Sequence, residues 1–186
     1  MPNEWRRSPW QLKEGEYPEG AKQTKKAFEV DLCALMKLMK VNSLPDKPSD
    51  NAKKAFENAM ERIENFLSHA SDTFPLVHEE IMEAARKLKS TLKKSEHLRI
   101  DVSKLDDIAL CAICGGLASM GLKEFTPDLW EDPLSAWNMS HRSIAIRIFQ
   151  STCRSGGLRR WSPVKNWYEN NALLERFYNH YVFHYL

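Results

Sequence analysis

Arginine side chains gather in one acid-free stretch of the sequence, residues 138–168, and they have the clearest potential for chemistry. The whole chain is nearly balanced, with 27 basic and 25 acidic residues, so its positive charge is sorted along the sequence. A guanidinium fork matches the geometry of phosphate, and a sorted basic patch is typical of a protein that binds a polyanion. The cations of this stretch are Arg142, Arg147, Arg154, Arg159, Arg160 and Lys165.

Aromatic residues among these cations favour a single-stranded nucleic acid as the polyanion. Trp161, Trp167 and Tyr168 lie between or beside the basic residues. Unstacked bases pack on aromatic faces that have arginines nearby. We therefore predict that the cations neutralise RNA phosphates and that Trp161 stacks a base. A second interpretation stays open, in which the arginines form solvated helix faces and their acidic partners lie elsewhere in the chain.

Two other groupings have the spacing of metal ligands. Cys111 and Cys114 match half of a zinc site or a redox pair, but no second pair follows at a finger-like distance. His180 and His184 stand one helical turn apart without the glutamate of a metalloprotease motif. We interpret the thiols as core residues and the histidines as part of an aromatic packing surface, and we expect neither a metal nor a cofactor.

No combination of residues in the sequence predicts catalysis. Glu79, Glu80 and Glu83 are better explained as partners of a helix dipole than as acid–base groups. Gly156-Gly157 lacks the spacing of a phosphate loop, although its N–H groups could approach a phosphate beside the arginines. We therefore expect a binding protein, not an enzyme.

Hydrophobic periodicity predicts helices along the chain and no strand. Apolar residues recur at helical spacing, whereas alternation with a period of two is nowhere sustained. The sequence thus predicts an all-α fold, a single bundle of six or seven short helices, in which residues 103–122 are the most apolar and form the candidate central helix. The expected helices span residues 24–39, 50–69, 76–92, 103–122, 141–153 and 163–186.

Side chains that cap helices define some of these boundaries. Ser49 or Asp50 is suited to begin the second helix, and Asn138 or Ser140 to begin the fifth. Gly156-Gly157 is expected to end the fifth helix, because glycine is costly to order within a helix.

Residues 1–20 are expected to form an irregular aromatic arm, followed by a single all-α domain at residues 21–186. Three prolines and two glycines exclude a regular helix in the arm. Its aromatic residues are expected to dock, either on their own domain or on a neighbouring subunit. The latter is the prediction that we adopt, and it extends to the aromatic C-terminal segment. The predicted subunit contacts are Trp5, Trp10, Tyr17, Phe177, Tyr181, Phe183 and Tyr185.

Length and composition are those of an ordinary globular domain. The chain has 186 residues, of which 42% are hydrophobic and 28% charged. No apolar run reaches the roughly 20 residues that span a bilayer, and residues 1–10 lack the apolar core of a signal peptide. Four cysteines in apolar helical contexts suit reduced thiols in the cytoplasm.

Residues 104–171 resemble the core of coat proteins from flexible filamentous plant viruses, the potexvirus-like group. In that family an apolar helix rich in Ala and Cys precedes a loop, and a helix that begins near an arginine follows. Phe177-Tyr178-Asn179 is the nearest match to the family's acidic Phe-Asp element. The matching elements are Phe125-Thr126, Pro133-Leu134-Ser135, Arg142, Leu158-Arg159, Pro163-Val164 and Asn166-Trp167.

The resemblance implies a helical bundle whose arms link neighbouring subunits around single-stranded RNA, with Arg159 as the pocket arginine. Our prediction is therefore a viral coat or nucleocapsid protein. It would bind single-stranded RNA without sequence preference and assemble with itself, in the host cytoplasm or in the virion. The alternative is a small helical adaptor, or a viral transcription or replication cofactor, that binds a protein partner through its aromatic surfaces.

Overall fold

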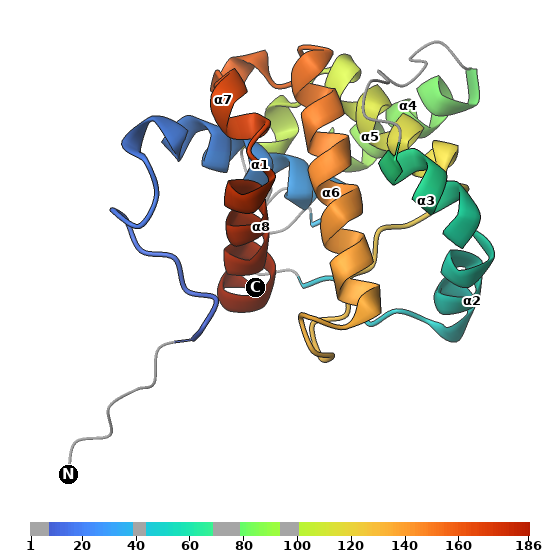
Figure 1. The fold of residues 1–186 in the computed structure, drawn as a ribbon. Helices are drawn as coiled ribbons and strands as arrows, with labels where there is room; N and C mark the ends of the chain where they lie inside the picture. Colours follow the sequence, from blue (N-terminus) through green and yellow to red (C-terminus); the bar gives the residue numbers. More distant parts are fainter. Residues whose placement is uncertain (1–7, 39–43, 69–78, 94–100) are drawn as a thin grey trace.

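The protein is all-α, as predicted. The computed structural model describes residues 8–38, 44–68, 79–93 and 101–186, and in these residues it has eight α-helices and no strand (Figure 1). The helices are α1 (Lys22–Leu35), α2 (Asp50–Asn58), α3 (Met60–Ser68), α4 (Glu79–Lys93), α5 (Asp107–Ser119), α6 (Ala136–Arg154), α7 (Lys165–Tyr168) and α8 (Asn171–His180).

The predicted number of helices was too low because two expected helices are each divided. The expected second helix breaks at Ala59, between α2 and α3. The expected last helix breaks after α7, where the Asn170 side chain accepts a hydrogen bond from the Leu173 N–H (3.1 Å) and caps α8. Asparagine favours a cap over a helix interior because its side chain competes for backbone groups. Periodicity alone does not reveal such a break.

The start of α6 also differs from the prediction. Ser135, not Asn138 or Ser140, caps the helix, and its hydroxyl accepts from the Asn138 N–H (3.2 Å). The Asn138 side chain is instead buried in the preceding loop, where it accepts from the Asp128 N–H and donates to the Asp128 carbonyl. By contrast, Ser49 caps α2 as predicted, at 3.1 Å from the Ala52 N–H.

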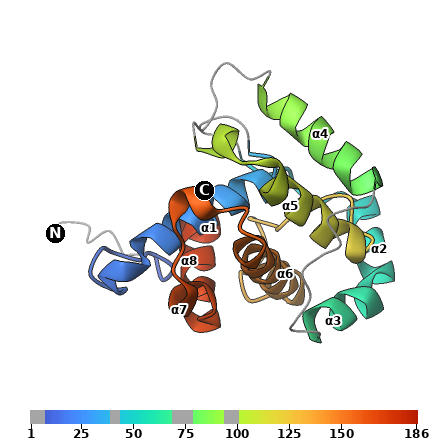
Figure 2. The same cartoon turned by 90° about the horizontal axis from the view of Figure 1, so that it is seen from above.

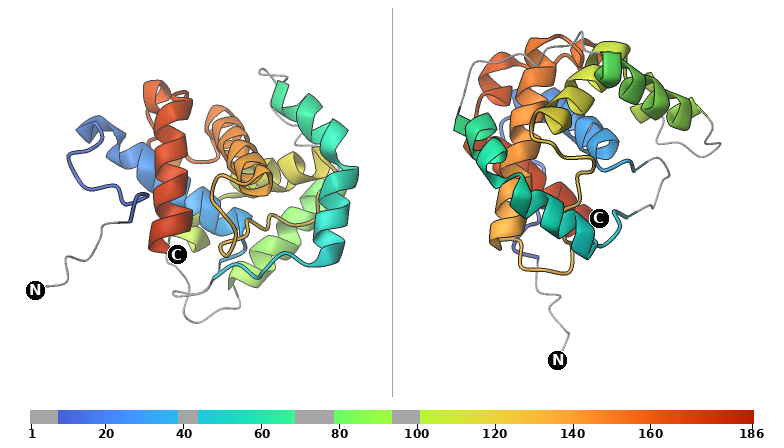
Figure 3. Two further views of the ribbon diagram at one scale, coloured as in Figure 1. Left: turned by 60° about the horizontal axis from the view of Figure 1, so that its bottom comes forward. Right: turned by 90° about the vertical axis from the view of Figure 1, so that its right-hand side faces the viewer.

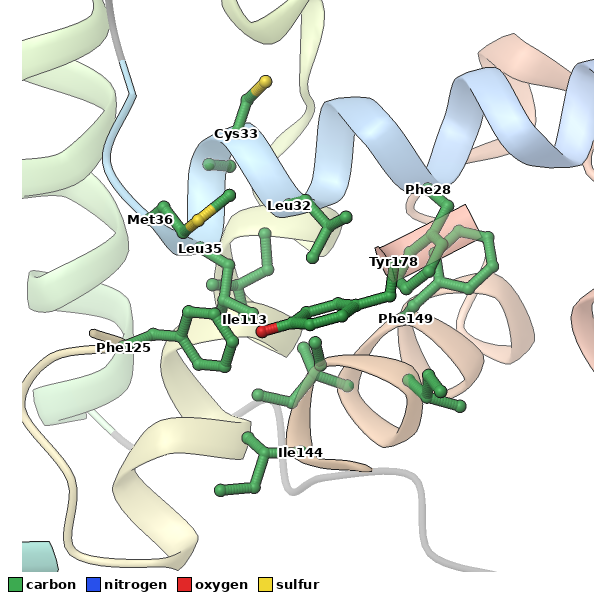
Figure 4. Close-up of a cluster of buried hydrophobic side chains, with 14 of the residues drawn as sticks. Phe28, Leu32, Cys33, Leu35, Met36, Ile113, Phe125, Ile144, Phe149 and Tyr178 are labelled. Carbon is green, nitrogen blue, oxygen red and sulfur yellow. The ribbon is translucent and has the colours of Figure 1, made fainter. Parts of the chain in front are cut away.

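α1 runs through the middle of the bundle, in contact with α5, α6 and α8 (Figure 2). The apolar helix α5, predicted to be central, packs on α1 but is covered by α4 and leaves Ile108 40% exposed. Phe28 of α1 meets Phe149 of α6 with ring centroids 4.6 Å apart, and Tyr178 of α8 reaches into the same cluster (Figure 4). The side chains of α6 that face the core are fully buried: Ile144, Ala145, Ile148 and Phe149.

Gly157 allows the loop after α6 to press against α5. A Cβ atom at this position would lie 2.7 Å from both the backbone N and the Cα of Ala109. Real Cβ atoms essentially never approach other atoms so closely, and here the neighbour is helix backbone that cannot rotate away. The absence of a side chain at Gly157 therefore fixes the position of the basic segment that follows it.

Residues 8–20 of the arm lie along α8 of their own chain (Figure 3). The Leu12 N–H donates to Nδ1 of His180 (3.1 Å), and the Arg176 guanidinium donates to the Glu16 carbonyl (2.9 Å). Tyr17 meets the Phe177 ring edge-on, with centroids 5.4 Å apart. This part of the arm therefore docks on its own domain, which is the alternative that the sequence left open.

This arrangement corrects several predicted subunit contacts. Phe177 and Tyr181 are only 1% and 3% exposed, so they belong to the core of their own chain. Tyr17 is half-buried against that core. The apolar side chains of α8 could not be assigned to an inner or an outer surface from the sequence, because both surfaces would be aromatic. Trp5 lies outside the described residues.

Replacing Tyr17 with alanine is expected to lower the free energy of unfolding by about 2 kcal/mol, because it removes apolar burial and an edge-on aromatic pair. Urea unfolding followed by circular dichroism measures this change. Tyr185→Ala is the matched control, since this residue is 66% exposed and keeps only a stacked contact with Tyr181 (5.5 Å), so its loss should change stability by less than about 1 kcal/mol. Equal effects of the two substitutions would contradict the docking of the arm.

Candidate nucleic-acid interface

The basic stretch forms one end of the molecule and continues along α6. From the C-terminus of α6 the chain passes through a short 3-10 helix, Arg159–Trp161, into α7. The C-terminal end of α6 and α7 both lie at the top of Figure 1. Arg147 and Arg154 are seven residues apart on α6 and therefore share a helix face. Arg142 lies nearer the start of α6, on the side of α8.

Three cations at this end are exposed and form no ion pair within the part of the chain that the structure describes: Arg159, Arg160 and Lys165. Their backbone is held in place by buried neighbours. Leu158 is fully buried, and the Val164 N–H donates to the buried Thr24 hydroxyl of α1 (3.0 Å). A rigid loop thus presents these charges to solvent.

The remaining arginines of the stretch are engaged to different extents. Arg142 donates to the Asn179 side-chain oxygen at 3.3 Å. Arg154 lies 4.0 Å from the carboxylate of Glu169, just beyond the acid-free stretch. Arg147 is half-buried and interacts within the chain. The interpretation that the arginines find acidic partners elsewhere therefore applies to Arg154 and not to the three exposed cations.

Trp161 is half-buried and packs on the core beside Arg159 and Arg160. The part of Trp161 that is not buried remains accessible, directly after two exposed arginines in the chain. Aromatic surfaces of this kind accept unstacked bases. Trp161 keeps the role predicted for it as a candidate stacking platform, with a smaller free area than an exposed ring would offer.

The Gly156-Gly157 backbone is not a phosphate site. Gly156 has φ +82° and ends α6, and its N–H donates to the Cys153 carbonyl (3.1 Å). The Gly157 N–H donates to the Thr152 carbonyl (3.0 Å). Both donors are consumed in closing the helix, so the suggested approach of these N–H groups to a phosphate is wrong. The predicted helix break at this position is confirmed.

The cysteine and histidine pairs lie in packed surroundings. Cys111 and Cys114 are half-buried on α5, and burial raises the pKa of Cys114 to about 11. His180 and His184 stack with centroids 5.2 Å apart. Within the described ranges no three His, Cys, Asp or Glu residues come together as a metal site.

An exposed apolar surface escaped the sequence analysis. Leu44 and Trp130 lie together in it, and Leu134 and Met139, from the loop before α6 and the first turn of that helix, are also exposed. Trp130 is 61% exposed and lines a groove of about 290 Å³ together with Val182 and Phe183. In the sequence, the available signal for this surface is a tryptophan within a proline-containing acidic loop.

Comparison with protein-family models, with characterised proteins and with solved structures finds no match for this chain. The resemblance to filamentous-virus coat proteins therefore stays a prediction. None of the helices in the described residues is both long and apolar enough to cross a bilayer.

Proposed function

We propose that this protein is a viral coat or nucleocapsid protein that binds single-stranded RNA without sequence preference and assembles with itself. The observation that carries the proposal is the set of three exposed cations, Arg159, Arg160 and Lys165, without ion-pair partners in the described residues. Unpaired cations on a rigid loop are free to contact phosphates. Arg147 and Arg154 lie along α6 beside this set, although Arg154 is paired with Glu169 and Arg147 interacts within the chain.

Phosphate contacts of this kind explain affinity but not sequence selection. Each contacted phosphate releases condensed counterions, whatever base it carries. Trp161 adds a stacking surface that accepts any base, because every base has a π-face. The affinity is therefore expected to depend steeply on salt concentration and hardly on the RNA sequence.

Self-association is supported by the apolar surface of Leu44, Trp130, Leu134 and Met139. Large apolar side chains exposed together, as Leu44 and Trp130 are in one groove, are a frequent sign of a contact with another protein. Of the aromatic residues predicted to form subunit contacts, Tyr185 is exposed and Phe183 and Trp10 are half-buried. These remain candidates for the same interface.

The same apolar surface also favours the second candidate function, a helical adaptor or a viral transcription or replication cofactor that binds a protein partner. The ratio of absorbance at 260 and 280 nm of the purified protein separates the two functions, because a coat protein retains nucleic acid. Negative-stain images add a second criterion, since only the coat protein should form large particles.

Charge reversal at Arg159 and Arg160 is expected to weaken binding to all RNA sequences alike, by about tenfold or more, since a hydrogen bond to a charged group contributes about 1.5–3 kcal/mol. The slope of log affinity against log salt should flatten by about one unit or more, because each single-strand contact contributes about −0.7. Fluorescence anisotropy with two unrelated RNA oligomers over a salt series measures both effects.

Lys47→Glu with Lys54→Glu is the matched control, because it changes the net charge equally at two exposed lysines of the α2 region that form no ion pair in the described residues. Lys25 and Lys26 are less suitable, since they pair with Glu29 and Asp101. Equal loss in the two double variants would mean that only net charge matters, and the adaptor function would then be preferred.

A further inference from the structure

A second groove, of about 740 Å³, separates the arm from α8. Trp10, Gln11 and Glu16 line it from the arm, and Arg176 and Asn179 line it from α8. Its size lies within the roughly 300–1,000 Å³ of ordinary ligand pockets. Figure 3 shows the arm running beside α8, so segments from distant parts of the sequence build the two walls.

Asn179 supplies hydrogen-bond donors to this groove. Its side chain is only 9% exposed, and its amide oxygen accepts from Arg142. That bond fixes the orientation of the amide, and its nitrogen has no acceptor among the residues that the structure describes. A nearly buried amide with unused donors is suited to bind an acceptor atom of a ligand.

Two planar groups line the groove, an indole and a guanidinium, and the guanidinium carries a positive charge. The indole of Trp10 is half-buried, and the exposed guanidinium of Arg176 is anchored by one hydrogen bond to the Glu16 carbonyl (2.9 Å). Indole and guanidinium planes both stack on nucleobases. The Glu16 carboxylate, which accepts from the Lys13 N–H (2.9 Å), disfavours a phosphate within the groove itself. A neutral, planar ligand with acceptor atoms satisfies all these groups.

We propose that this groove holds one unstacked nucleobase of the bound RNA, stacked on Trp10 and hydrogen-bonded to Asn179 and Arg176. The proposal rests on the proposed function. Arg142 connects the two regions, because it belongs to the basic stretch and also holds Asn179. RNA phosphates then follow α6 while a base turns towards α8.

The test compares an RNA oligomer with an abasic ribose-phosphate oligomer of the same length and charge. The full chain should bind the oligomer with bases about tenfold more tightly, and Trp10→Ala should lower this preference to the part that Trp161 supplies, while affinity for the abasic oligomer stays the same. Trp10→Phe should restore most of the preference, and it keeps the test valid if the alanine variant unfolds. Ile108→Ala removes an exposed apolar side chain of α5 that lines neither groove, and this variant should behave as the unaltered chain.

The outcomes separate this inference from the proposed function. If the unaltered chain or Trp10→Phe binds both oligomers equally, yet charge reversal at Arg159 and Arg160 weakens both, the base site is wrong and RNA binding stands. If Trp10→Ala loses affinity for both oligomers alike, Trp10 supports the arm and not a base. If the full chain binds neither oligomer, both proposals fail, and a peptide becomes the better candidate for the groove.

Discussion

Asp31→Asn is expected to stabilise the protein by several kcal/mol at pH 8 and to remove most of the pH dependence of stability between pH 6.5 and 8. Asp31 is fully buried between α1 and α6, and neither carboxylate oxygen has a hydrogen-bond partner in the described structure. The hydroxyl of Thr152 donates to the Ile148 carbonyl instead (2.9 Å). Burial raises the pKa of Asp31 to about 8, an effect that the nearby Thr152 only partly offsets.

The sign of the effect follows from proton binding. An unfolded aspartate has a pKa of about 3.9, so between that value and about pH 8 the folded state binds the extra proton. The contribution of Asp31 to stability is therefore greatest below its unfolded pKa and falls by about 1.4 kcal/mol per pH unit as the pH rises towards the folded pKa. His141 opposes this below pH 6.5, because burial lowers its pKa to about 4 and the unfolded state then binds more protons.

The clearest window is thus from pH 6.5 to 8, where His141 no longer contributes. Urea unfolding of the unaltered chain and of Asp31→Asn across this window measures the difference. Asp46→Asn, at an exposed position, is the matched control and should leave the pH profile as it is. If the free energy of unfolding changed with pH equally in the unaltered chain and in Asp31→Asn, this result would contradict the inference that burial raises the pKa of Asp31.

Gly157→Ala is expected to destabilise the protein by about 3 kcal/mol, because the added methyl group has no room against the backbone of α5. The loop and α5 must separate, which also displaces the exposed cations at Arg159 and Arg160. Thermal and urea unfolding measure the stability, and RNA affinity should fall in the same variant.

Gly20→Ala is the control for this substitution, since a Cβ there would meet only the Trp167 side chain, at 3.3 Å, and φ lies outside the left-handed region. It should cost no more than about 1 kcal/mol. If Gly157→Ala had the same unfolding midpoint as the unaltered chain, the prediction would be wrong, because the loop could then move away from α5 without loss of stability.

Patterns within a single helix predicted much of the fold. Periodicity identified the buried face of α6, and the glycine pair identified its end, because both depend on neighbouring residues. Asp31 shows what such patterns miss. An acid in the first helix suggests a solvated position, and only the packing of α6 on α1 places Asp31 in the core.

The candidate interface was predictable in its residue types but not in its exposure. The sequence presented Arg154 and Arg159 as equivalent cations. Their difference depends on Glu169, which α7 brings back to the end of α6. The groove between the arm and α8 was not predictable from the sequence. Its two walls come from segments that contact each other through residues 168 positions apart in the chain.

That separation also sets an order of events during synthesis. The arm leaves the ribosome early, but its hydrogen-bond partner His180 follows 168 residues later, after about 10–30 s at ordinary elongation rates. Until then the chain lacks α8, on which the arm docks, and also Tyr178, a large aromatic side chain that is fully buried in the core. Nascent chains therefore lack the groove between the arm and α8, so only a chain that has been translated through α8 can present the complete surface that we propose for RNA.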